Sequence, residues 1–118
     1  MDKEIEAFIE LKNLVEKMNV EVPCILVEGR KDKEALQKIG YKGKIDYANN
    51  FKGAKGKIAI LTDFDEEGKE IAKRIIKALG ERNVDMFFRK EFGRILKSIG
   101  RNDIQAISNL CEKYEKFL

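Results

Sequence analysis

Acidic residues follow two apolar segments of the chain. Glu28 comes directly after the apolar run at residues 24–27. Asp63 and Asp65 follow a second such run at residues 58–61. A run that is apolar at every position is typical of a strand buried on both faces of a parallel sheet. Since the carboxyl ends of parallel strands lie at the same edge, we expect the three carboxylates to converge if the two strands are neighbours.

Three carboxylates at close range repel one another unless a cation lies among them or a proton is taken up. Oxygen ligands of this kind suit Mg²⁺, which keeps several waters and takes further ligands from substrate phosphates. The Asp-x-Asp spacing lets two carboxylates on an extended turn face one ion. We therefore predict that Glu28, Asp63 and Asp65 bind Mg²⁺, for which Mn²⁺ is a possible substitute.

A simpler interpretation assigns these residues to helix capping. Acidic residues are favoured at the start of a helix, so Asp63 or Asp65 would serve as an N-cap. Glu28 would then be a polar strand end in solvent. One cap explains one carboxylate, however, and leaves the cluster unexplained. It also leaves unexplained why Glu28 is followed by Gly29, a residue that permits close approach of the backbone to a ligand.

Elsewhere, short apolar runs alternate with amphipathic segments, a pattern typical of an α/β fold. Helices are expected at residues 2–18, at 32–39 with Asp32 as N-cap, at 66–79, at 91–99, and from an N-cap at Asp103 to about 117; strands are expected at 24–27, around Ile45, at 58–61 and at 84–88. Residues 49–56, with two glycines, are expected to form an exposed loop.

The 118 residues have the length of one domain. We expect a single Rossmann-like α/β domain over residues 1–118, with a mainly parallel central sheet flanked by helices. Its core would span about residues 23–90, with helical extensions at 2–18 and 103–117 that pack on the sheet or form a dimer. No apolar segment is long enough to cross a bilayer and no secretion signal is recognisable, so a cytoplasmic protein without a membrane partner is expected.

Composition excludes several chemistries. The chain has no histidine, and its two cysteines, Cys24 and Cys111, are far apart in apolar surroundings. A Cys/His zinc site and any histidine-dependent acid–base mechanism are therefore excluded, and both thiols are expected to be buried. Charged residues make up 38% of the chain, mostly Lys and Glu, with a net charge of +3. This resembles the Lys/Glu enrichment of hyperthermophile proteins.

Residues 27–32 (Val-Glu-Gly-Arg-Lys-Asp) and 61–72 (Leu-Thr-Asp-Phe-Asp-Glu-Glu-Gly-Lys-Glu-Ile-Ala) resemble the two signature motifs of the Toprim domain. That domain is shared by type IA topoisomerases, bacterial-type primases, recombination proteins and ribosomal-RNA maturation nucleases. The resemblance extends over about residues 24–88. The second motif is similar to the topoisomerase version, in which Asp-x-Asp-x-Glu-Gly leads into a helix.

The resemblance implies a role for each matched acid. Glu28 would act as general acid or base at the leaving or attacking oxygen of a phosphodiester. Asp63 and Asp65 would hold Mg²⁺, and Glu67 matches a further acidic position of the topoisomerase pattern. Such an ion neutralises charge on the phosphodiester while a carboxylate moves a proton. Asp32 matches the last position of the first motif, where an N-cap role explains it equally well.

The sequence also departs from the larger Toprim enzymes. Topoisomerases usually have an arginine where this chain has Glu66, so one phosphate-contacting cation is missing. Nothing in the chain corresponds to the domain that carries the attacking tyrosine of a topoisomerase or to the cysteine cluster of a primase. Relaxing or priming DNA by this chain alone is therefore not expected. It looks like the minimal, single-domain Toprim proteins found in archaea.

Basic residues near the acidic motifs are candidate phosphate ligands. Arg30 and Lys69, one beside each motif, are placed to hold a scissile phosphate, and Arg30 is the preferred catalytic candidate. Lys52 and Lys55 lie in the glycine-bearing loop, where they would contact a nucleic-acid backbone. A second basic group is found towards the C-terminal helices, comprising Arg89, Lys90, Arg94, Lys97 and Arg101. A solvated surface explains either group equally well.

Two aromatic residues accompany these lysines. Phe51 and Tyr47 would stack on unpaired bases or anchor the loop in the core.

Three functions remain open on the sequence alone. The first is a Mg²⁺-dependent, nuclease-like enzyme acting on RNA or DNA phosphodiesters, with RNA somewhat preferred. The second is a non-catalytic nucleic-acid-binding or scaffold module that keeps the acidic pocket. The third is a phosphate-handling domain, such as a receiver-like or nucleotide-binding protein, against which the absence of a glycine-rich phosphate loop speaks.

Overall fold

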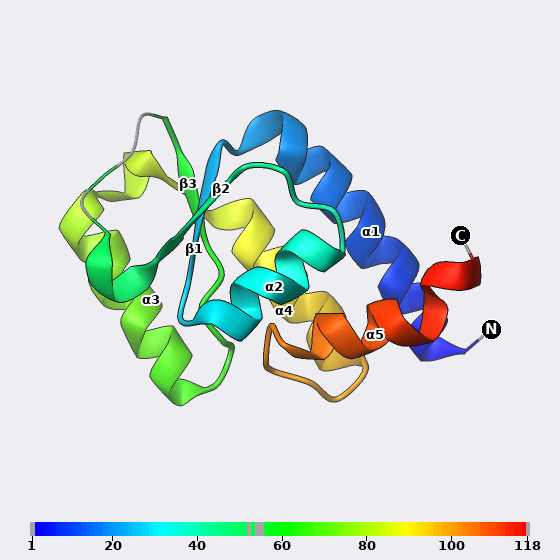
Figure 1. Ribbon diagram of the computed structural model, residues 1–118. Coiled ribbons are helices and arrows are strands. Elements are labelled where there is room, and N and C mark those ends of the chain that lie inside the picture. Colours follow the sequence, from blue (N-terminus) through cyan, green and yellow to red (C-terminus); the bar gives the residue numbers. More distant parts are fainter. Residues whose placement is uncertain (1, 52, 54–55, 118) are drawn as a thin grey trace.

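A parallel sheet lies at the centre of the protein, with helices on both of its faces (Figure 1). The computed structural model describes residues 2–51, 53 and 56–117, and within them four strands form the sheet in the order β2-β1-β3-β4. The strands are β1 (Cys24–Val27), β2 (Lys44–Tyr47), β3 (Ile58–Ile60) and β4 (Val84–Asp85). The predicted α/β class and parallel sheet are confirmed.

Helices connect the strands and extend the chain at both ends. They are α1 (Lys3–Glu21), α2 (Arg30–Lys38), α3 (Glu66–Leu79), α4 (Met86–Ser98) and α5 (Ala106–Tyr114), with short 3-10 turns η1 (Ala48–Asn50), η2 (Glu81–Asn83) and η3 (Glu115–Phe117). The radius of gyration of 13.5 Å is that of one compact unit of this length. No helix in the described residues is long and apolar enough to cross a membrane.

The strands that precede the acidic residues are direct neighbours. β1 pairs in parallel with β3, in a register that sets Leu26 opposite Ile60. The ladder continues beyond β3, because the Leu61 N–H donates to the Leu26 carbonyl at 2.8 Å. The carboxyl ends of the two strands therefore lie side by side, which is the arrangement that the convergence of Glu28 and Asp63 requires.

Alternate residues of the central strands face different cores. Ile25 and Val27 face a large cluster built with α1, α2, α4 and α5. Cys24 and Leu26 face a smaller cluster on the opposite side, covered by α3. Since every residue of β1 is buried, the strand is apolar throughout, as its sequence indicated. Cys24 and Cys111 are both buried free thiols, as predicted.

The strand predicted at residues 84–88 is largely wrong. Only Val84 and Asp85 pair with β3, and Met86 already begins α4. The Asp85 carboxylate accepts hydrogen bonds from the Phe87 and Phe88 N–H groups at 3.0 and 3.3 Å. This N-cap turns an apolar run with high strand propensity into the first turn of a helix. The helix predicted from residue 91 therefore starts earlier.

Two predicted caps are also wrong. Helix α2 begins after Gly29, and Asp32 occupies its third position, where the carboxylate reaches back to accept the Gly29 N–H at 3.1 Å. Asp103 forms an ion pair with Arg101 at 3.0 Å, and α5 begins only at Ala106.

Other predictions hold closely. Strand β1 and helix α3 have the predicted bounds, while α1 continues beyond Met18 until Pro23 prevents its extension. Of the predicted loop at residues 49–56, the first two residues belong to η1 and Phe51 is half-buried.

Candidate functional site

Glu28 and Asp63 join the ends of β1 and β3 at the carboxyl edge of the sheet. The Oε2 atom of Glu28 accepts the backbone N–H of Asp63 at 2.7 Å. Both side chains are half-buried. The contact links two segments that are distant in sequence, so the structure brings together two of the three predicted metal ligands.

Asp63 and Asp65 also bind backbone amides. The Oδ1 atom of Asp63 accepts the N–H of Ile104 at 2.9 Å, which ties the loop after β3 to the segment before α5. Asp65 is the N-cap of α3, and its Oδ1 accepts the Gly68 N–H at 2.7 Å. The capping interpretation is therefore correct for Asp65 and wrong for Asp63.

The chemistry of the carboxylates suits a hard divalent ion. Their positions and present hydrogen bonds determine whether they could bind one together. In the part of the chain that the structure describes, no group of three or more Asp, Glu, Cys or His side chains is arranged to hold a metal ion. Glu28, Asp63 and Asp65 each use one oxygen for a backbone N–H. A carboxylate has lone pairs for further partners, so the chemistry of each side chain allows it to bind a cation such as Mg²⁺ and keep its backbone contact.

We call the carboxyl edge of the sheet that carries Glu28, Asp63 and Asp65 the acidic edge, and two of its carboxyl groups have raised pKa values. Burial raises the pKa of Glu28, and the neighbouring charges of Asp63, Asp65 and Glu67 raise it further, against the effect of the Asp63 N–H. Burial likewise raises the pKa of Asp63, with a smaller contribution from Asp65. Carboxyl groups with raised pKa values in one place are typical of sites that take up a cation or move a proton.

Asp32 is a further carboxyl group that faces this site. Its side chain is 3% exposed, and among the described residues its Oδ1 has no hydrogen-bond partner. Burial raises its pKa to about 6, and the charges of Asp63 and Glu28 add to the effect. Asp32 is therefore a buried acid beside the candidate site.

Arg89 supports the loop between β3 and α3, which carries Asp63 and Asp65. It extends from α4, and its Nη1 donates to the carbonyls of Ile60 and Thr62 at 3.1 and 2.9 Å. Its Nη2 donates to the Asp63 carbonyl at 3.1 Å. Burial lowers the pKa of Arg89, and the charges of Glu28 and Asp63 oppose this. The guanidinium therefore both holds the loop and places positive charge behind the acids.

The sequence had placed Arg89 only in a diffuse basic group. The Asp85 cap is the signal that would have found it, because that cap starts α4 early and sets Arg89 in its first turns.

Close packing fixes the same loop on either side. The Phe64 ring lies under the Arg89 guanidinium, at 4.7 Å from ring centroid to Cζ, and packs against α4 at Gly93. On the other side, a Cβ atom at Gly68 would collide with the Asp63 carbonyl. Glycine at these two positions thus lets both helices approach the loop closely.

The two predicted basic ligands that the structure describes each form an ion pair within their own helix. The Arg30 side chain is 82% exposed and pairs with Glu34 at 3.4 Å. Lys69, in the first turns of α3, pairs with Glu66 at 3.7 Å. Lys52 and Lys55 lie outside the described residues. Glu67 is exposed in the first turn of α3, and its charge contributes to raising the pKa of Glu28.

The two aromatic candidates differ in their surroundings. Tyr47 packs against the larger core cluster, which agrees with its interpretation as an anchor. Phe51 packs against the smaller cluster and lines a cavity.

No protein-family model matches the chain. It is 34% identical to a UPF0292 protein of Thermococcus sibiricus, over 95% of this chain and 94% of that protein. It is also 34% identical to a UPF0292 protein of Archaeoglobus fulgidus, over 94% of this chain and 89% of that protein. Both relatives are archaeal, which agrees with the expected likeness to archaeal proteins.

The chain is also similar to a solved structure, a putative protein from Aquifex aeolicus, with a TM-score of 0.60 and 31% sequence identity between the two. It covers 86% of this chain, and the match spans 94% of the Aquifex protein.

Proposed function

We propose that this chain, which belongs to the UPF0292 family, is a Toprim-type enzyme that cleaves or transfers nucleic-acid phosphodiesters with Mg²⁺. The observation that carries the proposal is the hydrogen bond from the Asp63 N–H to Glu28, at the carboxyl edge of neighbouring parallel strands. In open α/β sheets this edge is where ligands bind. RNA is the preferred substrate class, with DNA as the alternative.

Each acid of the site has a role in this proposal. Asp63 and Asp65 would hold the ion, with Glu67 as a further acidic ligand and Glu28 shared between the ion and proton transfer. When bound, the ion offsets the negative charge of the phosphodiester. Glu28 moves a proton at the attacking or leaving oxygen, a role supported by the raised pKa that burial and three neighbouring acids produce.

The surroundings of the acids favour a preorganised site. The loop between β3 and α3 is held by Arg89 from one side, by the Ile104 N–H through Asp63, and by the Thr62 hydroxyl, which donates to the Gly68 carbonyl at 2.8 Å. A loop held by so many contacts keeps its carboxylates in place without reorganisation during the reaction.

The substitution Asp63→Asn tests the proposal. Asparagine keeps an oxygen for the Ile104 N–H, so the fold should persist while the charge is lost. The matched control is Asp2→Asn at the N-cap of α1, where asparagine caps as well as aspartate. Cleavage of structured RNA and single-stranded DNA in Mg²⁺ should fall by at least about 100-fold in the first variant and be unchanged in the control. Cleavage that persists undiminished in EDTA would overturn the proposal.

A non-catalytic nucleic-acid-binding or scaffold module is the second candidate. It is favoured by the use of all three carboxylates for backbone amides and by the lack of a three-ligand arrangement in the described residues. Such a module would bind nucleic acid with an affinity that falls with salt, without turnover. Multiple-turnover cleavage by the wild-type protein would eliminate this candidate.

A further inference from the structure

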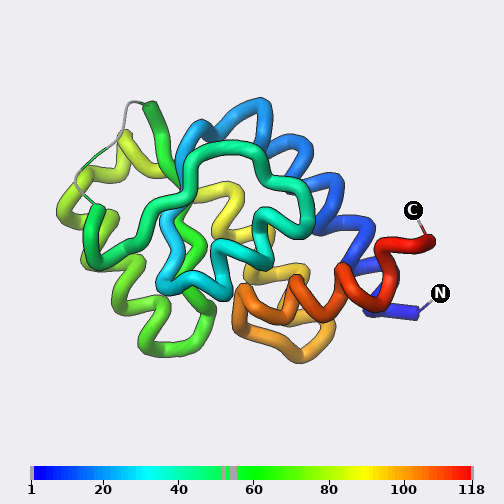
Figure 2. Tube along the Cα trace, viewed as in Figure 1, coloured from blue at the N-terminus to red at the C-terminus, as the bar shows by residue number. Residues whose placement is uncertain are grey.

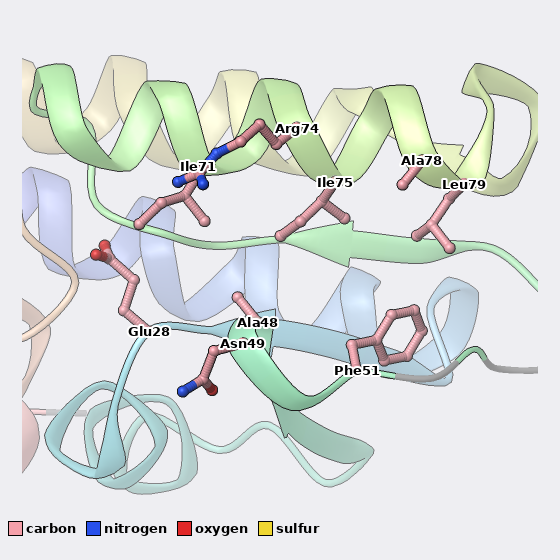
Figure 3. A pocket seen from close by; sticks show the side chains of 9 residues that line it. All are labelled: Glu28, Ala48, Asn49, Phe51, Ile71, Arg74, Ile75, Ala78 and Leu79. Atoms are coloured by element: carbon pink, nitrogen blue, oxygen red, sulfur yellow. The ribbon is translucent and has the colours of Figure 1, made fainter.

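A cavity opens directly beside Glu28, on the face of the sheet that α3 covers. It has a volume of about 450 Å³ and lies between α3 and the segment that follows β2 (Figure 3). Its α3 wall consists of residues spaced three and four apart, which share one face of the helix: Ile71, Arg74, Ile75, Ala78 and Leu79. We call it the α3 pocket. Its volume is in the range of small-molecule binding sites, about 300–1,000 Å³.

The α3 pocket has a polar end and an apolar end. Figure 3 shows Glu28, Asn49 and the Arg74 guanidinium towards one end, with Phe51 and Leu79 towards the other. The polar end is the one that meets the acidic edge, because Glu28 belongs to both. A ligand in the pocket would therefore have its apolar part on Phe51 and its polar part beside the candidate reaction centre.

Arg74 differs from Lys69 and Lys73, two other basic residues of α3, in its ion pairing. Lys69 and Lys73 each pair with a glutamate of the same helix. None of the ion pairs among the described residues involves Arg74. Its guanidinium instead lines the pocket and is available to an anion.

We propose that the α3 pocket takes an unpaired base of the nucleic-acid strand, next to the phosphodiester held at the acidic edge. A base has flat apolar faces and a polar rim, which matches a cavity with an aromatic ring at one end and charged side chains at the other. Phe51 stacks on the base, and Arg74 contacts the adjoining phosphate. This inference rests on the proposed function, since it specifies how the same site holds its substrate.

Charge favours a base within a strand over a free nucleotide. The pocket contains one cation, Arg74, and one carboxylate, Glu28, so its acidic and basic side chains balance. A polyphosphate entering the cavity would be repelled by Glu28. A neutral base enters without this cost, while its phosphodiesters remain outside the pocket near Arg74.

The test fills the pocket and measures binding without cleavage. Ala78 is an exposed position of α3, so Ala78→Trp adds bulk to the pocket without disturbing the core. The matched control is Lys77→Trp, at the adjacent exposed position that does not line the pocket. Fluorescence anisotropy in EDTA would follow the binding of a labelled single-stranded RNA of about 12 nucleotides, within the usual site size. An abasic strand of equal length is the second probe.

Ala78→Trp should weaken binding of the normal strand about tenfold, which corresponds to about 1.4 kcal/mol of stacking. The affinity of this variant for the normal strand should then equal its affinity for the abasic strand. Lys77→Trp should leave the difference between the two strands unchanged. Phe51→Ala, which adds no bulk, should reproduce the loss. Arg74→Ala should weaken binding more than Lys73→Ala and reduce the salt dependence by about one phosphate contact.

Equal binding of the two strands by the wild-type protein would overturn the inference, as would equal effects of Ala78→Trp and Lys77→Trp. An effect of Ala78→Trp on nucleoside monophosphates but not on the strand would overturn it as well. The proposed function is tested separately, because Asp63→Asn is expected to lose cleavage in Mg²⁺ while retaining binding in EDTA. Failure of the cleavage experiment counts against the proposed function, and failure of the binding experiment counts against the base-binding pocket, so the two proposals can be told apart.

Discussion

The two faces of the sheet are covered very differently. On one face, α1, α2, α4 and α5 bury a large cluster that includes Phe8, Phe88 and Phe92. On the other, α3 alone covers a small cluster, and Ile75 and Leu79 remain half-buried beside the α3 pocket. Figure 2 shows the same asymmetry along the chain trace, with α3 apart from the other helices. Burial of apolar area is thus concentrated on one face, and the other face carries the α3 pocket.

The acidic edge lies where the two faces meet. Arg89 reaches it from the thickly covered face, and the first turn of α3, with Asp65 and Gly68, reaches it from the thin one. The thickly covered face therefore holds the loop after β3 through Arg89, whereas the thin face leaves the α3 pocket beside Glu28.

The largest effect on stability is expected from Phe92→Ala in α4. Phe92 is fully buried in the large cluster, so the substitution should lower the free energy of unfolding by about 3–5 kcal/mol. Urea denaturation followed by circular dichroism would measure it. A loss below about 1 kcal/mol would contradict the view that this face carries most of the stability.

Arg89→Met should be nearly as costly, mainly because hydrogen bonds are lost. Methionine replaces the aliphatic stem but leaves the carbonyls of Ile60, Thr62 and Asp63 without their donor, a loss of about 3–4 kcal/mol. The pKa of Asp63 should also rise further, because the Arg89 charge lowers it. Denaturation and carboxyl NMR titration would measure the two effects.

The control for Arg89 is Arg94→Met on the same helix. Arg94 is exposed and pairs with Glu10 and Glu91, and exposed ion pairs contribute at most about 1 kcal/mol. Equal losses from the two substitutions would show that Arg89 has no special place beneath the acidic loop.

Asp32→Asn should stabilise the protein as the pH rises. The pKa of Asp32 is about 6 in the folded protein, against an ordinary value of 3.8. The folded state thus binds the proton more tightly than the unfolded state, and its stability falls between about pH 4 and pH 7 as the carboxyl ionises. Asparagine does not ionise and can still accept the Gly29 N–H. The free energy of unfolding of Asp32→Asn, relative to that of the wild type, should therefore rise by about 2–3 kcal/mol over this range. Denaturation in EDTA would measure it. The same pH trend in Asp2→Asn would contradict the assignment.

The smallest effect is expected from Ile75→Ala on the open face. Ile75 is half-buried beside the α3 pocket, so truncation should cost about 1 kcal/mol and enlarge the cavity. Comparison with Phe92→Ala by the same denaturation assay measures the difference between the faces. A cost as large as that of Phe92→Ala would mean that α3 is anchored as firmly as α4.

Local patterns predicted the parts of the fold in which pattern and environment agree. The run at residues 24–27 and the periodic face of α3 gave the observed bounds, because each is apolar where the core requires it. The prediction of a strand at residues 86–88 was wrong, because the Asp85 side chain caps a helix that begins there despite the strand propensity of these residues. The Asp85 cap could have placed Arg89 in the first turns of α4, but its partners are backbone carbonyls, which have no signature in the sequence.

The order and type of residues determined by themselves that an α/β chain would carry acids at two strand ends, because apolar runs, glycines and carboxylates have strong local preferences. Tertiary structure decided which acids lie close together. In the folded protein Glu28 accepts the Asp63 N–H, Asp65 caps α3, and Asp32 is buried. It also left a cavity under α3 beside Glu28. The reason is that contacts between distant segments depend on how helices fill the space on each face of the sheet, and that filling is a property of the whole molecule.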